Sequence, residues 1–289
     1  MEERKITFEP DKELLKKYVG NIVVIKYGGN AMTDPQAQEN VLKNVAQLKR
    51  WGVIPVLVHG GGPFIKEALK NAGIESEFID GHRKTGSEAI KYVEMALSGQ
   101  VNGKLVKHLN GYGCNAVGLT GKDGQIVTAQ KRMHMVDIDG AKEEKDLGHV
   151  GNVASINSHL IRTLIAENYM PVLAPIAAGE NLKDYNINAD MFAGHLAGAL
   201  NAMSFIALTN VDGLLRDIED PDSIISTITP TQLKEQMGDI VQGGMIPKVE
   251  ACMIAREKGA DQARIINGLR ADAILKTLLT EKGSGTVIQ

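Results

Sequence analysis

The sequence predicts an α/β protein built on a mostly parallel open sheet. Short runs of β-branched residues, such as residues 22–25, alternate along the chain with longer segments that have the 3.6-residue period of helices. Glycine clusters stand directly after two of these runs, which is typical of strand-to-helix turns at the carboxyl edge of a parallel sheet. With 289 residues, 43% of them hydrophobic and 23% charged, the chain is an ordinary globular protein in composition and is long enough for about two domains.

The charge balance and the two cysteines exclude several classes of function. The chain has 32 Lys and Arg residues against 35 Asp and Glu residues, so its net charge is −3 and no overall basic field would hold a nucleic acid. Cys114 and Cys252 lack the paired spacing of a zinc site or a redox dithiol, and we expect both to be buried as small apolar residues. The amino-terminal segment mixes charges of both signs without an apolar stretch, so we expect a cytoplasmic protein with no membrane partner.

Residues 1–20 are expected to form a helical extension before the sheet begins. Leu14 and Tyr18 lie one helical turn apart within residues 11–18, and Gly20 ends this helix. After residue 20 the alternating pattern of the first half predicts strands over residues 22–25, 53–58 and 115–119. It predicts helices over residues 37–48, from just after residue 63 to residue 71, and over residues 87–98 and 101–112.

Residues 125–150 do not follow this alternation of strands and helices. Short alternating segments around residues 126–128 and 149–150 flank the charged run 142–146, and they predict β-hairpins with a solvated tip. Three glycines spaced three residues apart are interpreted as turn residues: Gly118, Gly121 and Gly124.

The second half returns to the α/β rhythm. It predicts strands over residues 171–175, 205–209, 263–267 and 286–288, and helices over residues 157–168, from 188 onward, 231–237, 247–258 and 272–280. No linker rich in Pro, Gly or Ser separates the halves, so we expect two lobes that share one continuous sheet, with a boundary near residue 180. Ligands are expected at the carboxyl ends of the strands, where open parallel sheets bind them.

Two glycine clusters are the first candidates for a binding site. Residues 26–30 read Lys-Tyr-Gly-Gly-Asn, and residues 59–62 read His-Gly-Gly-Gly. Either cluster alone also fits a tight turn between a strand and a helix. Two clusters, with a lysine opening the first, favour a phosphate cradle, because glycine lets backbone amides approach an anion closely.

Three further loops carry polar residues that the chemistry of such a cradle needs. They are residues 185–190 (YNINAD), 209–214 (TNVDGL) and 243–248 (GGMIPK). Singly, they have ordinary interpretations, such as a helix N-cap for Asn188 and a turn at Asp212. The sequence has neither G-x-x-x-x-G-K-[ST] nor a G-x-G-x-x-G that follows a strand and opens a helix, which argues against P-loop NTPases and Rossmann dehydrogenases.

In combination, these segments resemble the amino-acid kinase family over residues 21–289. The resemblance rests on IKYGGNAM, VLVHGGGP, GHRKT, EMALSGQVN, AVGLTGKD, LGHVGNV, YNINAD, TNVDGLL and GGMIPKVE. It implies a three-layer α/β sandwich, with an amino-acid-binding and dimerisation lobe over residues 21–180 and a nucleotide-binding lobe over residues 181–289. Within the family, the chain is most similar to the enzymes that use ATP to phosphorylate the side-chain carboxylate of N-acetyl-L-glutamate in arginine biosynthesis.

The resemblance also implies roles for individual residues. Lys26 and Lys248 would stabilise the transferring phosphoryl group, and Asp190 would hold both lysines in place. The substrate would be bound by Gly61, Gly62, Arg83 and Asn186, and the nucleotide by Gly28, Gly29, Asn210, Asp212, Gly213 and Leu214. Mg²⁺ would be held by the ATP phosphates, with Asp190 reaching it through water.

No catalytic base is required by this chemistry. A glutamate side chain with a pKa of about 4.3 is already ionised at neutral pH. Three histidines within the motifs, His59, His82 and His149, are therefore interpreted as loop-shaping residues that form hydrogen bonds.

Three positions depart from the family pattern. Asn210 stands where an acid is common, and Lys84 and Gly86 replace a valine and a polar or acidic residue. An extra cation beside Arg83 would favour a substrate with one more carboxylate, so a kinase of N-succinylglutamate or of a carrier-linked aminoadipate stays open as an alternative. A non-catalytic sensor of nucleotide or amino acid is an alternative from another class, although the two lysines argue against it.

The resemblance implies at least a homodimer. The interface would use a helix over residues 87–98, in which Ile90, Val93 and Leu97 follow helical spacing, although this pattern also fits burial within one chain. A hexamer would use the helix over residues 11–19.

The resemblance also bears on feedback by L-arginine. Arginine-inhibited members of the family have a histidine and a glutamate at the positions of Asp272 and Thr277 in this sequence. Because the carboxylate that would pair with the guanidinium is missing, we expect little or no inhibition by L-arginine.

Overall fold

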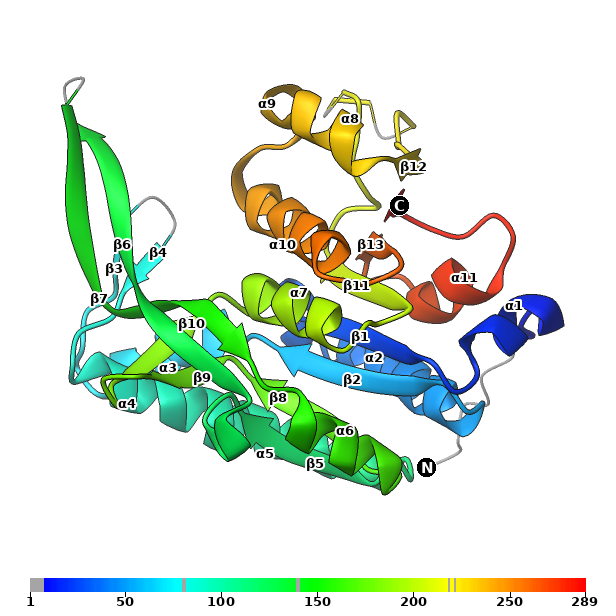
Figure 1. Ribbon diagram of the computed structural model, residues 1–289, viewed down its shortest axis with the longest axis horizontal. Helices are drawn as coiled ribbons and strands as arrows, with labels where there is room; N and C mark the ends of the chain where they lie inside the picture. Colours follow the sequence, from blue (N-terminus) through cyan, green and yellow to red (C-terminus); the bar gives the residue numbers. More distant parts are fainter. Residues whose placement is uncertain (1–7, 80–81, 139–140, 218, 221) are drawn as a thin grey trace.

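An eight-stranded sheet forms the centre of the molecule (Figure 1). The computed structural model describes residues 8–79, 82–138, 141–217, 219–220 and 222–289. Neighbouring strands of this sheet are parallel except for the antiparallel pair β13 and β14, which confirms the predicted fold class. In spatial order the strands are β12 (Thr227–Ile228), β14 (Thr286–Ile288), β13 (Ala263–Asn267), β11 (Ser204–Thr209), β1 (Ile22–Tyr27), β2 (Ile54–His59), β8 (Met170–Ala174) and β5 (Ala116–Thr120).

Helices cover both faces of the sheet and make the molecule three layers deep. Strand β1 shows why, since Val23 and Ile25 belong to the core on one face and Val24 to the core on the other. The face of Val24 is covered by α6 (His159–Ala166), α7 (Ala189–Ala199), α8 (Pro230–Glu235), α9 (Met237–Ile240) and α10 (Ile246–Glu257). The face of Val23 is covered by α2 (Pro35–Arg50), α5 (Asn102–Gly111) and α11 (Ala273–Leu279).

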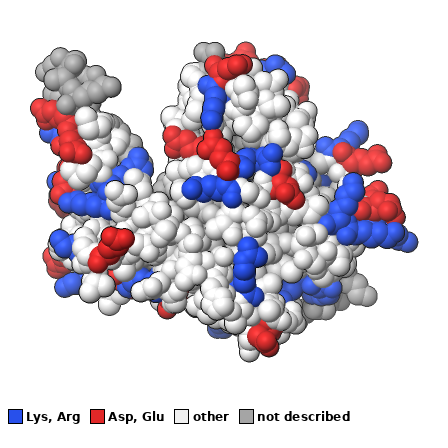
Figure 2. Space-filling model, viewed as in Figure 1, with Lys and Arg blue, Asp and Glu red and all other residues white. Residues whose placement is uncertain are grey.

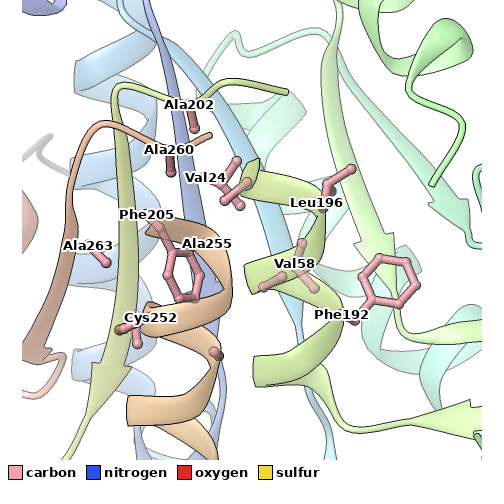
Figure 3. Packing of buried hydrophobic residues seen from close by; sticks show 14 of the residues in the cluster. Val24, Val58, Phe192, Leu196, Ala202, Phe205, Cys252, Ala255, Ala260 and Ala263 are labelled. Carbon is pink, nitrogen blue, oxygen red and sulfur yellow. The ribbon is translucent and has the colours of Figure 1, made fainter. Parts of the chain in front are cut away.

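The packing between the sheet and α7 and α10 fixes the frame of the site (Figure 3). Phe205 of β11 is fully buried in this layer, where a side chain of its size contributes roughly 1.5–3 kcal/mol to folding. The two helices approach so closely that a Cβ on Gly194 would lie 2.4 Å from the carbonyl oxygen of Ala251. Cys252 of α10 is buried in this layer and Cys114 in the opposite layer, both as free thiols, as expected from their spacing.

One long hairpin replaces the several short hairpins predicted over residues 125–150. Strands β6 (Val127–Ile138) and β7 (Ala141–Ile156) pair along most of their length and project from the body of the molecule (Figure 1). Their bases form a small closed barrel with β9 (Ile176–Gly179) and β10 (Asp184–Ile187). The charged run 142–146 lies within β7, and its exposed residues give the arm a mixed charge (Figure 2), with Lys131 and Asp146 2.6 Å apart across the hairpin.

The interpretation of Gly118 as a turn residue is wrong. Gly118 lies inside β5, and a Cβ there would meet the side-chain oxygen of Asn102 at 2.0 Å. Close packing, rather than a turn, therefore requires glycine. Gly124 has a φ of 56° in a short 3-10 helix (Asp123–Gln125) and does serve a turn.

The two helices predicted over residues 87–112 form one continuous helical path. Helix α4 (Ala89–Glu94) passes into a π-helix (Met95–Val101) and then into α5. Ile90, Val93 and Leu97 are buried within this chain, against residues such as Ile65 of α3 (Gly62–Asn71) and Ile176. Their periodic pattern is therefore accounted for by the core of one chain, and the dimer stays a prediction.

The amino-terminal helix packs on its own chain. Helix α1 (Lys12–Tyr18) is capped by Asp11, whose backbone N–H also donates a hydrogen bond to the carbonyl of Leu279 at the end of α11. The first seven residues of the predicted extension lie outside the described residues. A two-stranded sheet of β3 (Glu77–Ile79) and β4 (His82–Lys84) completes the fold and was not predicted. Among the described helices, none combines the length and the apolar character needed to cross a membrane.

Candidate active site

The predicted loops meet at one edge of the sheet. Strands β11, β1 and β2 are parallel neighbours, with Tyr27 paired with His59 and Lys26 with Ala207. Because parallel strands end at the same edge, the loop after β1, the loop after β2 and the loop after β11 lie side by side.

The structure brings Lys26, Asp190 and Lys248 into one cluster at this edge. The ammonium nitrogen of Lys26 lies 3.1 Å from Oδ2 of Asp190, and that of Lys248 lies 3.2 Å from the same oxygen. Lys26 and Asp190 are buried, at 6% and 5% exposed, whereas Lys248 reaches the surface. These three side chains come from β1, from the first turn of α7 and from the first turn of α10.

Local sequence explains how Asp190 reaches this place. Asn188 caps α7, and its side-chain oxygen accepts hydrogen bonds from the backbone N–H groups of Asp190 and Met191. This cap holds the carboxylate at the amino end of the helix, where the helix dipole favours a negative charge.

The electrostatics of the cluster leave an excess of positive charge. Burial lowers the pKa of Lys26; Asp190 offsets this effect only in part, and Lys248 adds to it. Burial alone would raise the pKa of Asp190, but the two ammonium groups outweigh burial and hold it below its usual value. One carboxylate thus faces two cations, an arrangement that attracts a phosphate chain.

The first glycine loop leaves room for the Lys26 ammonium. A Cβ on Gly28 would lie 3.0 Å from the nitrogen of that side chain, so only glycine leaves the lysine undisturbed. Gly29 has a φ of 68°, a conformation that favours glycine. Both glycines line a cavity of about 350 Å³ whose other lining residues include Thr209, Asn210, Gly244 and Lys248.

The second glycine loop opens helix α3. Gly61 is the N-cap residue and Gly62 the first helical residue, so the backbone N–H groups of the first turn have no partners within the helix. The N–H of Gly60 donates to the carbonyl of Tyr27 at 2.7 Å, which fixes this loop beside the first one. A helix amino terminus in this position suits an anion.

A second cavity of about 390 Å³ adjoins the first and is more apolar. The two cavities share Val211, Gln242 and Met245, and the second is also lined by Gly213, Leu214, Leu215 and Ile240. Gly213 and Thr286 shape the wall of this second cavity. Gly213 has a φ of 152°, a conformation that favours glycine, and it lies against Thr286. The hydroxyl of Thr286 accepts a hydrogen bond from the Leu214 N–H at 2.8 Å.

Asp212 is placed differently from the other predicted nucleotide contacts. It is not among the described residues that line either cavity. Its Oδ1 accepts hydrogen bonds from Asn267 at 2.8 Å and from Nε of Arg270 at 2.5 Å. These bonds lower the pKa of Asp212 and hold its carboxylate against the end of β13 and the loop that follows.

Arg83 and Asn186, the predicted substrate contacts, lie outside the lysine and aspartate cluster. Arg83 is partly buried in β4, where its guanidinium stacks over the ring of Phe78 at 4.5 Å and donates a hydrogen bond to Ser76. Asn186 is partly buried in β10, two residues before the cap of α7. Asn186 is therefore close to Asp190 along the chain, whereas Arg83 belongs to a separate small sheet.

Two of the three motif histidines form hydrogen bonds that shape loops, as expected. His59 is fully buried; burial lowers its pKa to about 4, and its Nδ1 lies 2.9 Å from the carbonyl oxygen of Gly60. His149 bonds through Nδ1 to the carbonyl of Asp184 at 2.7 Å. The side chain of His82 lies outside the described residues.

Sequence reasoning missed one buried residue next to the site. Asn102 lies 3.0 Å from Nε2 of His59, at the start of α5. Asn102 is the last residue of the motif EMALSGQVN, and this membership was the one sign in the sequence that it could lie near the site.

The described residues contain no group of three or more His, Cys, Asp or Glu side chains that could hold a metal ion. The carboxylate of Asp190 faces two ammonium groups instead.

The fold and this cluster define a class of phosphotransferases, and comparison with known sequences agrees. A profile of the Amino acid kinase family matches residues 21–267, and the chain belongs to this family.

The individual relatives with similar sequences include several acetylglutamate kinases. The chain is 44% identical over 273 residues to the acetylglutamate kinase of Methanococcus aeolicus, a match that covers 94% of this chain and 93% of the relative. It is also 44% identical over 279 residues to the acetylglutamate kinase of Heliobacterium modesticaldum, which covers 95% and 94% of the two chains.

Solved structures share the fold at lower identity. The N-acetylglutamate synthase from Neisseria gonorrhoeae, complexed with coenzyme A and N-acetyl-glutamate, superimposes with a TM-score of 0.79 at 20% identity. That match covers 96% of this chain but only 61% of the synthase, so this chain spans less than two thirds of the synthase. Carbamate kinase from Giardia lamblia bound to AMP-PNP gives a TM-score of 0.65 at 20% identity and covers 93% and 98% of the two chains. Identities this low show the fold alone.

Proposed function

We propose that this chain transfers the γ-phosphoryl group of ATP to the side-chain carboxylate of N-acetyl-L-glutamate, which yields N-acetyl-L-glutamyl 5-phosphate for arginine biosynthesis. The observation that carries the proposal is the Asp190 carboxylate, which lies between the ammonium groups of Lys26 and Lys248 at the edge of the sheet where the two glycine loops begin. The acetylglutamate kinases that match over more than nine tenths of this chain support the choice of substrate.

The chemistry follows from charge and position. The attacking carboxylate is already ionised at neutral pH, so no residue has to remove a proton. In the transition state, negative charge spreads over the oxygens of the transferring phosphoryl group and over the attacking and leaving oxygens. Lys26 and Lys248 would stabilise this charge, and Asp190 would keep their ammonium groups in place.

The glycine loops would bind the two ends of the reacting system. Backbone amides of Gly28 and Gly29 would hold the ATP phosphates, because both residues line the cavity that reaches Lys248. Amides of Gly61 and Gly62 at the start of α3 would hold the substrate carboxylate and the transferring group.

We assign the nucleotide to the pair of adjoining cavities. Asn210 lies in the first, while Gly213 and Leu214 lie in the more apolar second one, which suits an adenine ring. Asp212 would act from further away by holding Arg270 and Asn267. The substrate is MgATP: its phosphate oxygens would bind Mg²⁺, with Asp190 as the nearest protein carboxylate.

This assignment gives the two parts of the chain different tasks. Residues 21–180 would bind the amino acid, with Arg83 gripping its α-carboxylate and Asn186 its acetamido or α-carboxylate end. Residues 181–289 would bind the nucleotide. At least a homodimer is proposed as the assembly, with a hexamer as a larger form.

The choice among acyl groups rests on Lys84. Its ammonium lies 2.9 Å from the carboxylate of Glu77 in the facing strand, so the extra cation of the GHRKT segment already has a partner. This pairing favours N-acetylglutamate over N-succinylglutamate, whose second carboxylate would have to displace Glu77.

The test is an ADP-release assay that compares N-acetylglutamate, N-succinylglutamate, N-acetylaminoadipate and free glutamate under one set of conditions. We expect N-acetylglutamate to have the highest kcat/KM. A higher value for another substrate would reassign the acyl group or chain length. Nucleotide binding without ADP release in any arm would contradict the kinase and favour a sensor.

A further inference from the structure

A buried hydrogen-bond network links the second glycine loop to helix α5. His59 is fully buried and Asn102 is 4% exposed. Nδ2 of Asn102 lies 3.0 Å from Nε2 of His59 and donates a second hydrogen bond to the carbonyl of Val172 at 2.9 Å. At the other side of the imidazole, Nδ1 lies 2.9 Å from the carbonyl oxygen of Gly60.

The partners in this network determine where the imidazole proton lies. The Val172 carbonyl can only accept, so the amide of Asn102 must present its nitrogen there. The same nitrogen then donates its other hydrogen to Nε2 of His59, which leaves Nε2 unprotonated. The single proton of the neutral ring is on Nδ1, and it is donated to the carbonyl of Gly60.

This bond fixes a peptide group that would otherwise turn easily. Gly60 and Gly61 both lack a Cβ, so the peptide between them has little steric preference of its own. In a trans peptide, the carbonyl of one residue and the N–H of the next point in opposite directions. Holding the Gly60 carbonyl on the buried ring of His59 therefore turns the Gly61 N–H away from that ring.

The π-helix places Asn102 and packs on the same loop. A π-helix has a wider turn than an α-helix and is often found at functional sites. Here it ends at Val101, directly before Asn102. A Cβ on Gly61 would meet Leu97 at 2.6 Å and Val101 at 3.4 Å, so these two side chains of the π-helix fill the space beside Gly61.

On its other side, Asn102 is seated against strand β5. A Cβ on Gly118 would lie 2.0 Å from Oδ1 of Asn102, so a glycine is required there. The side chain is thus held by β5, by β8 through Val172, and by His59 of β2.

We propose that His59 and Asn102 are positioning residues for phosphoryl transfer, which orient the Gly60–Gly61 peptide so that the Gly61 N–H faces the reacting groups. This inference rests on the proposed function, in which that amide binds the substrate carboxylate and the transferring group. His59 itself does not exchange a proton in the reaction. Low pKa and burial agree with a ring that stays neutral.

The first test needs no substrate. Nitrogen-15 NMR of the imidazole in the wild-type protein at neutral pH should show His59 protonated at Nδ1 and unprotonated at Nε2. In Asn102→Asp, the new carboxylate can only accept from Nε2, so the single proton of the ring should move from Nδ1 to Nε2, and the donor to the Gly60 carbonyl is lost. A wild-type ring protonated at Nε2 would overturn the proposal.

The second test uses two replacements of the ring that differ in the position of one nitrogen. The amide of Asn in His59→Asn lies where Nδ1 was and can still donate to Gly60, whereas that of Gln in His59→Gln lies where Nε2 was. We expect His59→Gln and Asn102→Asp to lower kcat by about tenfold or more, with KM for ATP changed by no more than about twofold, because only the reacting geometry is lost. His59→Asn should retain most of the kcat. Equal kcat values for His59→Asn and His59→Gln would contradict the proposal.

Asn110→Asp is the matched control. Asn110 lies at the other end of α5, and its amide bonds to Ala116 of β5 rather than to the glycine loop. This variant should unfold at a lower temperature but keep the wild-type kcat, which separates loss of stability from loss of position. A wild-type protein without kinase activity would contradict the proposed function, while the NMR measurement would still decide the state of His59.

Discussion

The ammonium group of Lys26 lies 3.1 Å from the carboxylate of Asp190, and both side chains are almost completely shielded from solvent. Isolated buried charges are costly, and a buried pair usually returns little net stability. The arrangement has a different benefit, since a shielded cation acts on a phosphoryl group with less screening than an exposed one. Asp190 also serves Lys248, so a single carboxylate positions both cations.

Alanine at either lysine should nearly abolish turnover. Lys26→Ala and Lys248→Ala should each lower kcat by about a hundredfold or more, since each removes a charge that acts in the transition state. Binding of ATP should weaken less, and steady-state kinetics together with calorimetric titration of a non-hydrolysable ATP analogue will separate the two effects. Lys234→Ala, which removes a surface pair with Glu257, should behave as wild type. A near-normal kcat for either active-site variant would remove that lysine from the mechanism.

Arg83 should affect the amino-acid substrate rather than the nucleotide. Replacing it with Lys keeps the charge but loses the bidentate geometry that suits a carboxylate. We expect KM for N-acetylglutamate to rise in Arg83→Lys and more in Arg83→Ala, with KM for ATP almost unchanged. Parallel increases in both KM values would place Arg83 outside the substrate pocket.

The strands of the central sheet other than the two-residue β12 could be predicted, because each of them carries its own signal. Residues 22–25 are a β-branched run in a strand that is buried on both faces, and the glycines after Tyr27 mark the end of the strand. The meeting of Lys26 with Asp190 depends on parallel strands that end at one edge, and the loop motifs indicated that edge.

Other features could not be predicted because they depend on contacts between distant parts of the chain. Asp212 forms its bonds with Arg270, 58 residues further on, and its own surroundings in the sequence suggest only a turn. The periodicity of Ile90 and Leu97 predicts a helix but not which surface buries it. The π-helix before Asn102 leaves almost the same apolar pattern as an α-helix, so its wider turn has no separate signal.

Stability should fall as the pH drops below neutrality, because two histidines have lowered pKa values in the folded protein. Burial lowers the pKa of His59 to about 4, and burial with Lys258 nearby lowers that of His195 to about 4. Well above pH 6.5 these rings are neutral in both the folded and the unfolded state, so they contribute no pH dependence there. Between pH 6.5 and 4 the unfolded chain takes up protons that the folded chain does not, which destabilises the fold between pH 7 and pH 5 by roughly 2 kcal/mol for the fully buried His59 and by less for the partly exposed His195.

Urea unfolding at pH 7 and pH 5 measures this effect. The loss of unfolding free energy over this range should be smaller in His59→Asn than in the wild type. The same loss in both proteins would show that His59 is not the group that takes up the proton.

L-Arginine should inhibit weakly or not at all. The hydroxyl of Thr277 donates to the carbonyl of Ser284 at 2.7 Å, and the guanidinium of Arg264 occupies the space beside it, 2.8 Å from the Thr277 carbonyl. A second guanidinium would meet a like charge there and would lack a carboxylate partner, an interaction of roughly 1.5–3 kcal/mol. Initial rates at saturating ATP will decide, and strong inhibition at sub-millimolar L-arginine would show that other residues form a regulatory site.

The central claim is that a carboxylate oxygen of N-acetyl-L-glutamate receives the γ-phosphoryl group, and trapping the product with hydroxylamine tests it most directly. An acyl phosphate reacts to give a hydroxamate, which can be measured beside the ADP released. We predict one hydroxamate per ADP with the wild-type enzyme, dependent on N-acetyl-L-glutamate and lost in Lys26→Ala. Release of ADP without hydroxamate would mean that water or another group accepts the phosphoryl group, and it would contradict the account.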